Sequence, residues 1–124
     1  MPQYMYQASY TPESVANLVG DPQDRIETIR PALEDMGATI LAYGYPIGEY
    51  DVLIVYNASD DTTAAGLALA IAAGGAMRSA TTTRLLTGNE WVDSLQKAQR
   101  SGYRPIRDRM ANGRKRLSLI HRSR

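Results

Sequence analysis

The sequence contains no cysteine and only one histidine, and these scarcities exclude several kinds of site. Without cysteine, the chain has no disulfide bond, no thiolate metal ligand and no cysteine nucleophile. His121 has no second imidazole to join it in a metal cluster, and the carboxylates show no metal-ligand spacing. Gly74-Gly75 marks a helix end rather than a phosphate-binding loop. We therefore expect no metal and no cofactor.

Long apolar runs and targeting segments are also lacking. The longest apolar run, Ala64–Ala73, is too short and too small-sided to span a bilayer. Met1-Pro2-Gln3-Tyr4 lacks the basic and apolar regions of a signal peptide. We therefore expect a cytoplasmic protein with no membrane span. Its 124 residues suit a single hydrophobic core.

Charge is distributed unevenly along the chain. Residues 1–100 hold 6 basic and 12 acidic residues, whereas residues 101–124 hold 8 basic residues and 1 acidic residue. The net charges are therefore −6 and +7. This asymmetry predicts an acidic domain over residues 1–100 and a basic C-terminal arm over residues 101–124.

Hydrophobic periodicity and capping signals predict a mixed α+β chain. Predicted strands are Gln3–Tyr10, Ala38–Tyr45, Tyr50–Asn57 and Met77–Leu86. Predicted helices begin at Thr11-Pro12, Asp21-Pro22, Asp60-Asp61 and Thr87-Gly88, and Pro31 is expected to bend the second. The order β-α-β-β-α-β is that of a ferredoxin-like fold with a four-stranded antiparallel sheet, here followed by an extra C-terminal helix and the basic arm.

The hairpin between the second and third strands leads to a prediction about assembly. Centring it on residues 47–48 pairs Tyr45 with Tyr50 and Tyr43 with Val52. Both faces of the sheet are then apolar, so both are expected to be buried. The face with small residues suits the Ala-rich helix, which is itself expected to be buried on every side. The face with Tyr43 and Val52 then requires a second copy, which predicts a dimer or higher homo-oligomer.

The turn before the third strand carries a family resemblance. Gly48-Glu49-Tyr50-Asp51-Val52 follows a Tyr-containing strand and precedes an Ala/Leu helix and a Thr-rich strand. In this order and spacing, the chain resembles the GYD-domain family over roughly residues 3–90. The resemblance implies the dimeric α+β barrel superfamily, in which two ferredoxin-like sheets close face to face. That superfamily includes cofactor-free monooxygenases, lactone isomerases, haem enzymes and ligand-binding regulators, so the resemblance implies a fold and no particular reaction.

Tyrosines are the first candidates for chemistry, because the chain has eight of them and no phenylalanine. A buried phenol needs a hydrogen-bond partner, so a core that requires only bulk uses phenylalanine freely. One hypothesis is a small-molecule pocket between the sheets, lined by Tyr6, Tyr43 and Tyr45, in which phenols orient a ligand or stabilise an enolate-like oxygen. The simpler interpretation is interface tyrosines bonded to backbone or water.

Three further residues complete the candidate pocket, namely Tyr50, Asp51 and Arg78. As a general base, Asp51 needs burial or a neighbouring charge, and its place beside a Gly-containing turn better suits accepting backbone N–H bonds across the hairpin. Arg78 and Arg84 fall on one face of the fourth strand and can clamp a carboxylate or phosphate. Solvent contact or pairing with acids at an interface is the favoured interpretation. No catalytic residue is identified, so an enzymatic role stays open.

The basic arm is the second distinctive feature. Its partner-binding candidates are Arg104, Arg107, Arg109, Arg114, Lys115 and Arg116. Arginine suits planar contacts with carboxylate or phosphate groups. Three hypotheses compete: docking on an acidic protein surface or larger complex, contact with nucleic acid, and a solubilising tail. The nucleic-acid hypothesis lacks interleaved aromatic residues for base stacking. The alternative to a ligand pocket is therefore a non-catalytic accessory subunit whose arm docks on a larger assembly.

Overall fold

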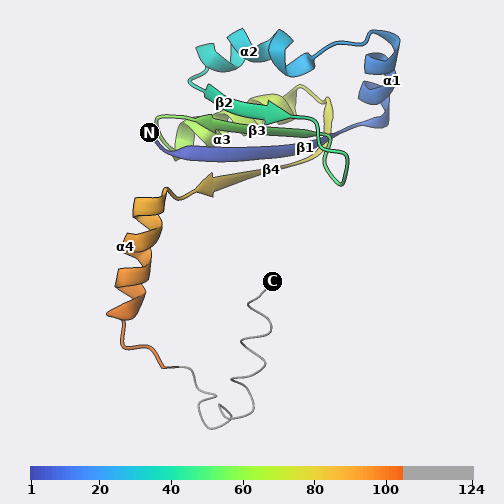
Figure 1. Cartoon of the computed structure of the whole chain (residues 1–124). Helices are drawn as coiled ribbons and strands as arrows, with labels where there is room; N and C mark the ends of the chain where they lie inside the picture. Colours follow the sequence, from blue (N-terminus) through green and yellow to red (C-terminus); the bar gives the residue numbers. More distant parts are fainter. Residues whose placement is uncertain (105–124) are drawn as a thin grey trace, which may run out of the picture. The chain divides into compact units, whose positions relative to one another are not determined.

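The computed structural model describes residues 1–104, and the chain forms two compact units, Met1–Thr87 and Gly88–Arg124. The first unit contains all the strands of the described chain (Figure 1). Its elements are β1 (Gln3–Tyr10), α1 (Pro12–Gly20), α2 (Arg25–Asp35), β2 (Thr39–Gly44), β3 (Val52–Asn57), α3 (Asp61–Ala73) and β4 (Met77–Leu85). The described part of the second unit contains α4 (Gly88–Gln99).

The helix starts follow from local capping, with one correction to the prediction. The Thr11 hydroxyl accepts the backbone N–H of Ser14 at 3.0 Å, and Pro12 begins α1 as predicted. The predicted start of α2 at Asp21-Pro22 is wrong, because the N-cap is Asp24, which accepts the N–H of Glu27 at 3.3 Å. Pro31 lies inside α2, which continues to Asp35.

The four strands form one sheet in the order β2-β3-β1-β4, and all neighbouring pairs are antiparallel (Figure 1). β1 lies inside the sheet, where Tyr6 pairs with Ile54 on β3 and with Thr82 on β4. β2 and β4 are the edge strands. An α+β fold with a four-stranded antiparallel sheet is thus confirmed.

The register of the β2–β3 hairpin differs from the prediction. Tyr43 pairs with Ile54 rather than with Val52, and the register shifts between Ile40 and Ala42. β3 begins two residues later than expected, so the connection is longer and the centre of the hairpin moves. A change of two residues keeps Tyr43 on the same face as Val52, because side chains alternate with a period of two.

Helices α2 and α3 cover one face of this sheet and form the core with it. The buried residues from the sheet are Tyr4, Tyr6, Ala8, Val52, Ile54 and Tyr56, and the helices add Ile26, Leu33, Ala64 and Leu67. This is the face that carries Tyr43, which also packs on the core. The expectation that a second copy covers this face is therefore wrong, because the chain's own helices cover it.

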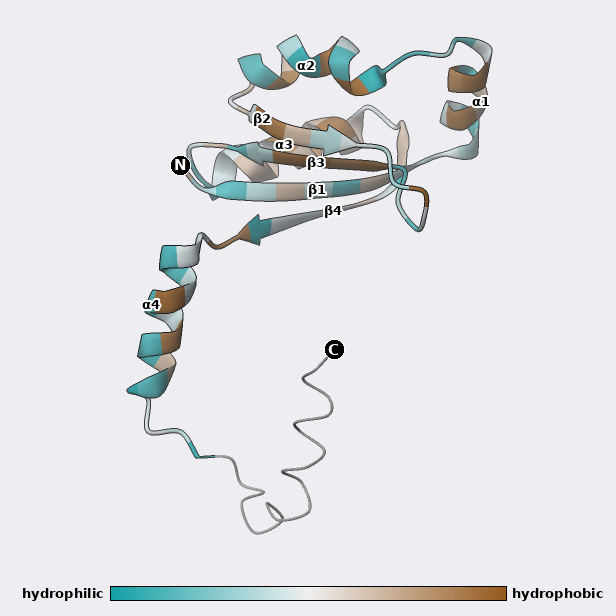
Figure 2. Ribbon diagram, in the orientation of Figure 1, coloured by the Kyte–Doolittle hydropathy of each residue, from teal (hydrophilic) through white to brown (hydrophobic). Residues whose placement is uncertain are grey.

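The opposite face of the sheet is called the open face, because no helix of residues 1–87 packs on it. Met5 pairs with Val55, and Gln7 pairs with Leu53. These residues alternate with the buried ones and are only partly buried. β3 is brown over most of its length in Figure 2, with a paler arrowhead end, in agreement with apolar side chains on both of its faces. On the open face, Met5, Leu53 and Val55 are apolar side chains that the helices do not cover and that are only partly buried.

Helix α3 is more exposed than the sequence suggested. Ala64 and Leu67 are its buried residues, whereas Leu69 is 70% exposed. A helix lying on one side of a sheet buries a single stripe of its surface, so the expectation of burial on every side is wrong. Within residues 1–104, no helix combines the length and the apolar character that crossing a membrane requires.

Candidate functional site

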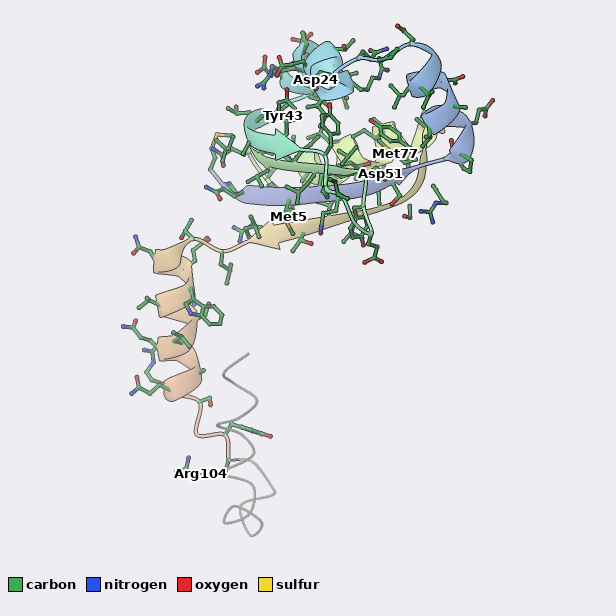
Figure 3. All side chains as sticks on the ribbon, turned by 45° about the vertical axis from the view of Figure 1, so that its right-hand side comes forward. Met5, Asp24, Tyr43, Asp51, Met77 and Arg104 are labelled. Atoms are coloured by element: carbon green, nitrogen blue, oxygen red, sulfur yellow. The ribbon has the colours of Figure 1, made fainter. Side chains whose placement is uncertain are left out.

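A chamber of about 240 Å³ lies between helices α2 and α3 and the sheet face that they cover. Its apolar walls come from α2, α3, β3 and β4, and they include Ile26, Ile29, Val52, Ile54, Ile71 and Met77. Met77 is labelled in Figure 3. α2 contacts mainly β2 and α3 mainly β4, the strands at opposite edges of the sheet. A concave, mostly apolar space with a few polar groups is the usual form of a small-molecule site.

Tyr6 is the polar residue deepest in the wall of this chamber. It is 4% exposed, and its hydroxyl has no hydrogen-bond partner in the part of the chain that the structure describes. Burial is the main cause of the raised pKa of Tyr6, and the negative charge that Tyr10 gains when it ionises adds to the effect. The hydroxyl therefore stays protonated and remains a donor. Leaving such a group unpaired costs about 1–3 kcal/mol, which an acceptor atom on a ligand can recover.

A second, smaller cavity shares the wall formed by Tyr6, Ile54 and Ile71. Its volume is about 20 Å³, and its other walls are apolar, including Leu33 and Leu67. A cavity of this size holds about one water molecule, and an ordered water needs two to four polar partners. The smaller cavity is therefore no ligand site, and the chamber is the better candidate.

The remaining pocket candidates on β2 lie in a different place, called here the Asp24 cluster: Asp24, Glu27, Tyr43 and Tyr45. The Tyr43 hydroxyl lies 2.6 Å from Asp24 Oδ2 and 2.9 Å from Glu27 Oε2 (Figure 3). The Tyr45 hydroxyl donates to Asp24 Oδ1 and accepts the backbone N–H of Ile26 at 3.1 Å. These bonds fasten the first turn of α2 to the end of β2.

The charges of the Asp24 cluster set the protonation of its members. Hydrogen bonds from Tyr43 and Tyr45 lower the pKa of Asp24. The hydrogen bond to Asp24 is the main cause of the raised pKa of Tyr43. Burial, and then the bond to Asp24, raise the pKa of Tyr45 to about 12. Both phenols are thus held neutral as donors to a carboxylate, which suits a structural role and leaves no free donor for a ligand.

Tyr50 and Asp51 lie where the β2–β3 connection meets the end of β1. Asp51 Oδ2 accepts the backbone N–H of Tyr10 at 3.0 Å, and the N–H of Asp51 donates to the carbonyl of Ala8 at 2.8 Å. Ser9 donates to the carbonyl of Glu49 at 3.1 Å. The carboxylate thus accepts a backbone N–H bond, as expected for its turn, although the donor is on β1 rather than across the hairpin.

The two arginines of β4 do not form a clamp. Arg84 Nε lies 3.8 Å from Asp61 Oδ1, and Asp61 also accepts the Tyr4 hydroxyl at 2.6 Å. Arg78 is exposed and lines a groove of about 570 Å³ between α3 and β4, beside Leu69. The structure therefore pairs Arg84 within the chain and leaves Arg78 on the surface.

The partner-binding candidates fall almost wholly outside the described residues. Arg104 is exposed. The candidates beyond the described residues are Arg107, Arg109, Arg114, Lys115 and Arg116, and the single histidine, His121, also lies outside them. On α4, Trp91 and Leu95 are 56% and 49% exposed. Across residues 1–104, no group of three or more histidine or acidic side chains could hold a metal ion.

Sequence reasoning missed Tyr10 and Arg25 as members of the chamber. Alternation along the predicted strand Gln3–Tyr10 places Tyr10 on the same side as Tyr6, and that shared side was the available signal. The position of Arg25 was not predicted, because α2 was expected to begin at Asp21-Pro22 rather than at Arg25. Asp24, followed three residues later by Glu27, is the capping pattern that places Arg25 in the first turn.

The comparisons with known proteins give one result. No curated protein matches the chain, and no solved structure matches it. The model of the family described as GYD domain matches residues 4–94, which include the sheet except Gln3, the chamber and the Gly48-Glu49-Tyr50-Asp51 turn. The chain therefore belongs to the GYD-domain family.

Proposed function

We propose that this GYD-domain protein binds a small, largely apolar molecule in the chamber between α2, α3 and the sheet. The observation that carries the proposal is the buried hydroxyl of Tyr6, a residue that lines the chamber, because this hydroxyl has no partner within residues 1–104. Phenylalanine at this position avoids the cost of an unpaired hydroxyl. A ligand with an acceptor oxygen gives Tyr6 the partner that the chain does not supply.

The chemistry available in the chamber is binding and polarisation. A protonated phenol in an apolar cavity orients a carbonyl group and stabilises negative charge that develops on its oxygen. Asp51 is bonded to the backbone of Tyr10 and is not part of the chamber wall. The described residues thus support a binding protein. Its Tyr6 phenol can stabilise charge on the ligand during a reaction, but the described residues of the chamber wall supply no catalytic carboxylate.

A neutral probe with one acceptor group tests this proposal. Methyl 3-(4-fluorophenyl)propanoate is titrated with the full-length protein and followed by ¹⁹F NMR. We expect binding to the native protein, weakening of about five- to tenfold in Tyr6→Phe, and no change in Tyr45→Phe, whose hydroxyl belongs to the Asp24 cluster. Absence of binding to the native protein, or equal binding to Tyr6→Phe, overturns the proposal.

We also propose that the domain is ferredoxin-like and pairs with a second copy through its open face, as in a dimeric α+β barrel. The strand order β2-β3-β1-β4 and helices on one face of the sheet support the first part. Met5, Leu53 and Val55 on the uncovered face support the second, because a pair of such faces removes apolar surface from water.

Light scattering on matched variants tests the pairing. We expect the native protein at twice its 13.6 kDa chain mass or a higher multiple. Val55→Asp on the open face should shift it to a monomer, whereas Val19→Asp, at an exposed position on α1, should not. A monomeric native protein contradicts the proposal, as does a Val55→Asp variant that keeps its fold by circular dichroism and still assembles.

An accessory role is the second candidate function, and exposed apolar side chains on α4 favour it. Trp91, Val92 and Leu95 are each about half exposed, at 56%, 50% and 49%. Together with the arginines of residues 101–124, this helix can dock on an acidic partner surface. Deletion of residues 101–124 should then abolish association with that partner in a salt-dependent manner, and an arm-less protein that associates normally contradicts this role.

A further inference from the structure

The chamber opens toward a polar hollow, and the two share part of their walls. The hollow has a volume of about 350 Å³ and is lined by Ser14, Asn17 and Gln23 among others. Tyr10, Arg25 and Ala76 line both the hollow and the chamber. These three residues therefore mark the mouth of the chamber, and Tyr6 marks its inner wall.

Arg25 is an unpaired cation at this mouth. It is exposed, and no carboxylate or other acceptor within residues 1–104 bonds its guanidinium group. The nearby acids are engaged elsewhere: Asp24 accepts from Tyr43 and Tyr45, and Asp51 accepts from Tyr10. Asp21 accepts from the Gln23 side chain at 3.2 Å. The five N–H donors of Arg25 are thus available at the mouth, where a bound ligand would extend beyond the apolar walls of the chamber.

We infer that the ligand is an apolar carboxylic acid, bound with its carboxylate at Arg25 and Tyr10 and its apolar body in the chamber. This inference rests on the function proposed above. A guanidinium group matches a carboxylate with two parallel hydrogen bonds. The phenol of Tyr10 is partly buried, and burial raises its pKa, so it stays a donor beside the arginine.

The dimensions and charges of the site narrow the ligand class further. Tyr6 and Tyr10 are four residues apart on one strand, which separates their Cα atoms by about 13 Å. A single aromatic ring with a short acid side chain, or a short aliphatic acid, fits this span. The acids around the mouth repel a free anion, so binding depends on the apolar body as well as on the carboxylate. Inorganic phosphate should therefore fail to compete.

The test uses an acid, its methyl ester and two arginine variants of the full-length protein. Binding of 3-(4-fluorophenyl)propanoate and of its methyl ester is measured by ¹⁹F NMR. We expect the acid to bind the native protein about tenfold more tightly than the ester, and Arg25→Gln to remove this preference without weakening the ester. The matched control is Arg30→Gln, on the same helix, because Arg30 is paired with Glu27 at 2.8 Å and is not in the chamber wall.

The outcomes separate the two proposals. Equal binding of acid and ester, an acid preference that survives in Arg25→Gln, or competition by inorganic phosphate overturns the carboxylate inference and leaves the chamber as a site for neutral ligands. Failure of both probes to bind the native protein overturns the proposed function itself. Loss of the acid preference in Arg30→Gln also contradicts the inference. In that case the acid would bind more tightly because of any positive charge on α2, and not because of contact with Arg25.

Discussion

Two groups of tyrosines on the same face of the sheet differ in whether their hydroxyls have partners. At the Asp24 cluster, the hydroxyls of Tyr43 and Tyr45 both donate to carboxylates of α2. In the chamber, the Tyr6 hydroxyl is buried and unpaired as far as residues 1–104 are concerned. The fold thus supplies hydrogen-bond acceptors for the hydroxyls of the first group, and the described residues supply none for the hydroxyl of Tyr6. The comparison gives the Asp24 cluster a role in stability and leaves in the chamber the unpaired donor on which the proposed ligand site rests.

Truncation of Ile26, the residue that connects the two groups, should give the largest loss of stability. Ile26 is 1% exposed and lines the chamber, while its backbone N–H donates to the Tyr45 hydroxyl. Ile26→Ala enlarges the chamber but keeps that backbone bond, and it should lower the free energy of unfolding by about 2–5 kcal/mol, as urea denaturation measures. A loss below about 1 kcal/mol would show that the chamber wall collapses freely and is not a preformed site.

Removing the shared acceptor of the Asp24 cluster should give the next largest effect. Asp24→Ala takes away the acceptor of two phenols and the N-cap of α2. We expect Tm to fall by about 5–10 °C in calorimetry, because a lost cap and unpaired donors add together. The control is Asp35→Ala at the last residue of α2, which should leave Tm nearly unchanged. Equal effects at both positions would contradict the role assigned to the cluster.

Removing single hydroxyls should change stability in opposite directions in the two groups. Tyr6→Phe should raise the free energy of unfolding by about 1 kcal/mol, because it deletes an unpaired buried group. Tyr45→Phe should lower it by about 0.5 kcal/mol, a value reduced by the 45% exposure of Tyr45. Denaturation curves of both variants without ligand provide the measurement. A loss of stability in Tyr6→Phe would mean that Tyr6 has a partner in solution.

The smallest expected effect is a difference in pH dependence. Hydrogen bonds from Tyr43 and Tyr45 hold the pKa of Asp24 below its ordinary value of 3.8. The stabilisation is therefore complete above that ordinary value and is lost as pH falls through the lower pKa of the folded state. The difference in urea midpoint between the native protein and Asp24→Ala should be constant from about pH 6 to 8 and narrow below about pH 4. If the difference in urea midpoint instead widened as the pH fell, the pKa of Asp24 would be raised in the folded state rather than lowered.

The fold was more predictable from the sequence than the site was. Strand patterns such as Gln3–Tyr10 and the Thr11-Pro12 cap depend on neighbouring residues, and the structure has them where they were expected. Which face the helices cover depends on packing between distant segments. Both faces of β3 are apolar, so the prediction relied on side-chain size alone and chose the wrong face. The partners of Tyr43 and Tyr45 depended on the true start of α2 at Arg25.

The bonds between Asp51 and β1 have a consequence for how the molecule opens. The N–H of Asp51 donates to Ala8, and its carboxylate accepts from Tyr10, so the two segments hold each other reciprocally. Neither amide proton can exchange with solvent unless the same junction separates. The Gly48-Glu49-Tyr50-Asp51 turn and the strand that carries Tyr6 and Tyr10 therefore belong to one cooperative unit. Local unfolding of that turn releases the mouth of the chamber as well.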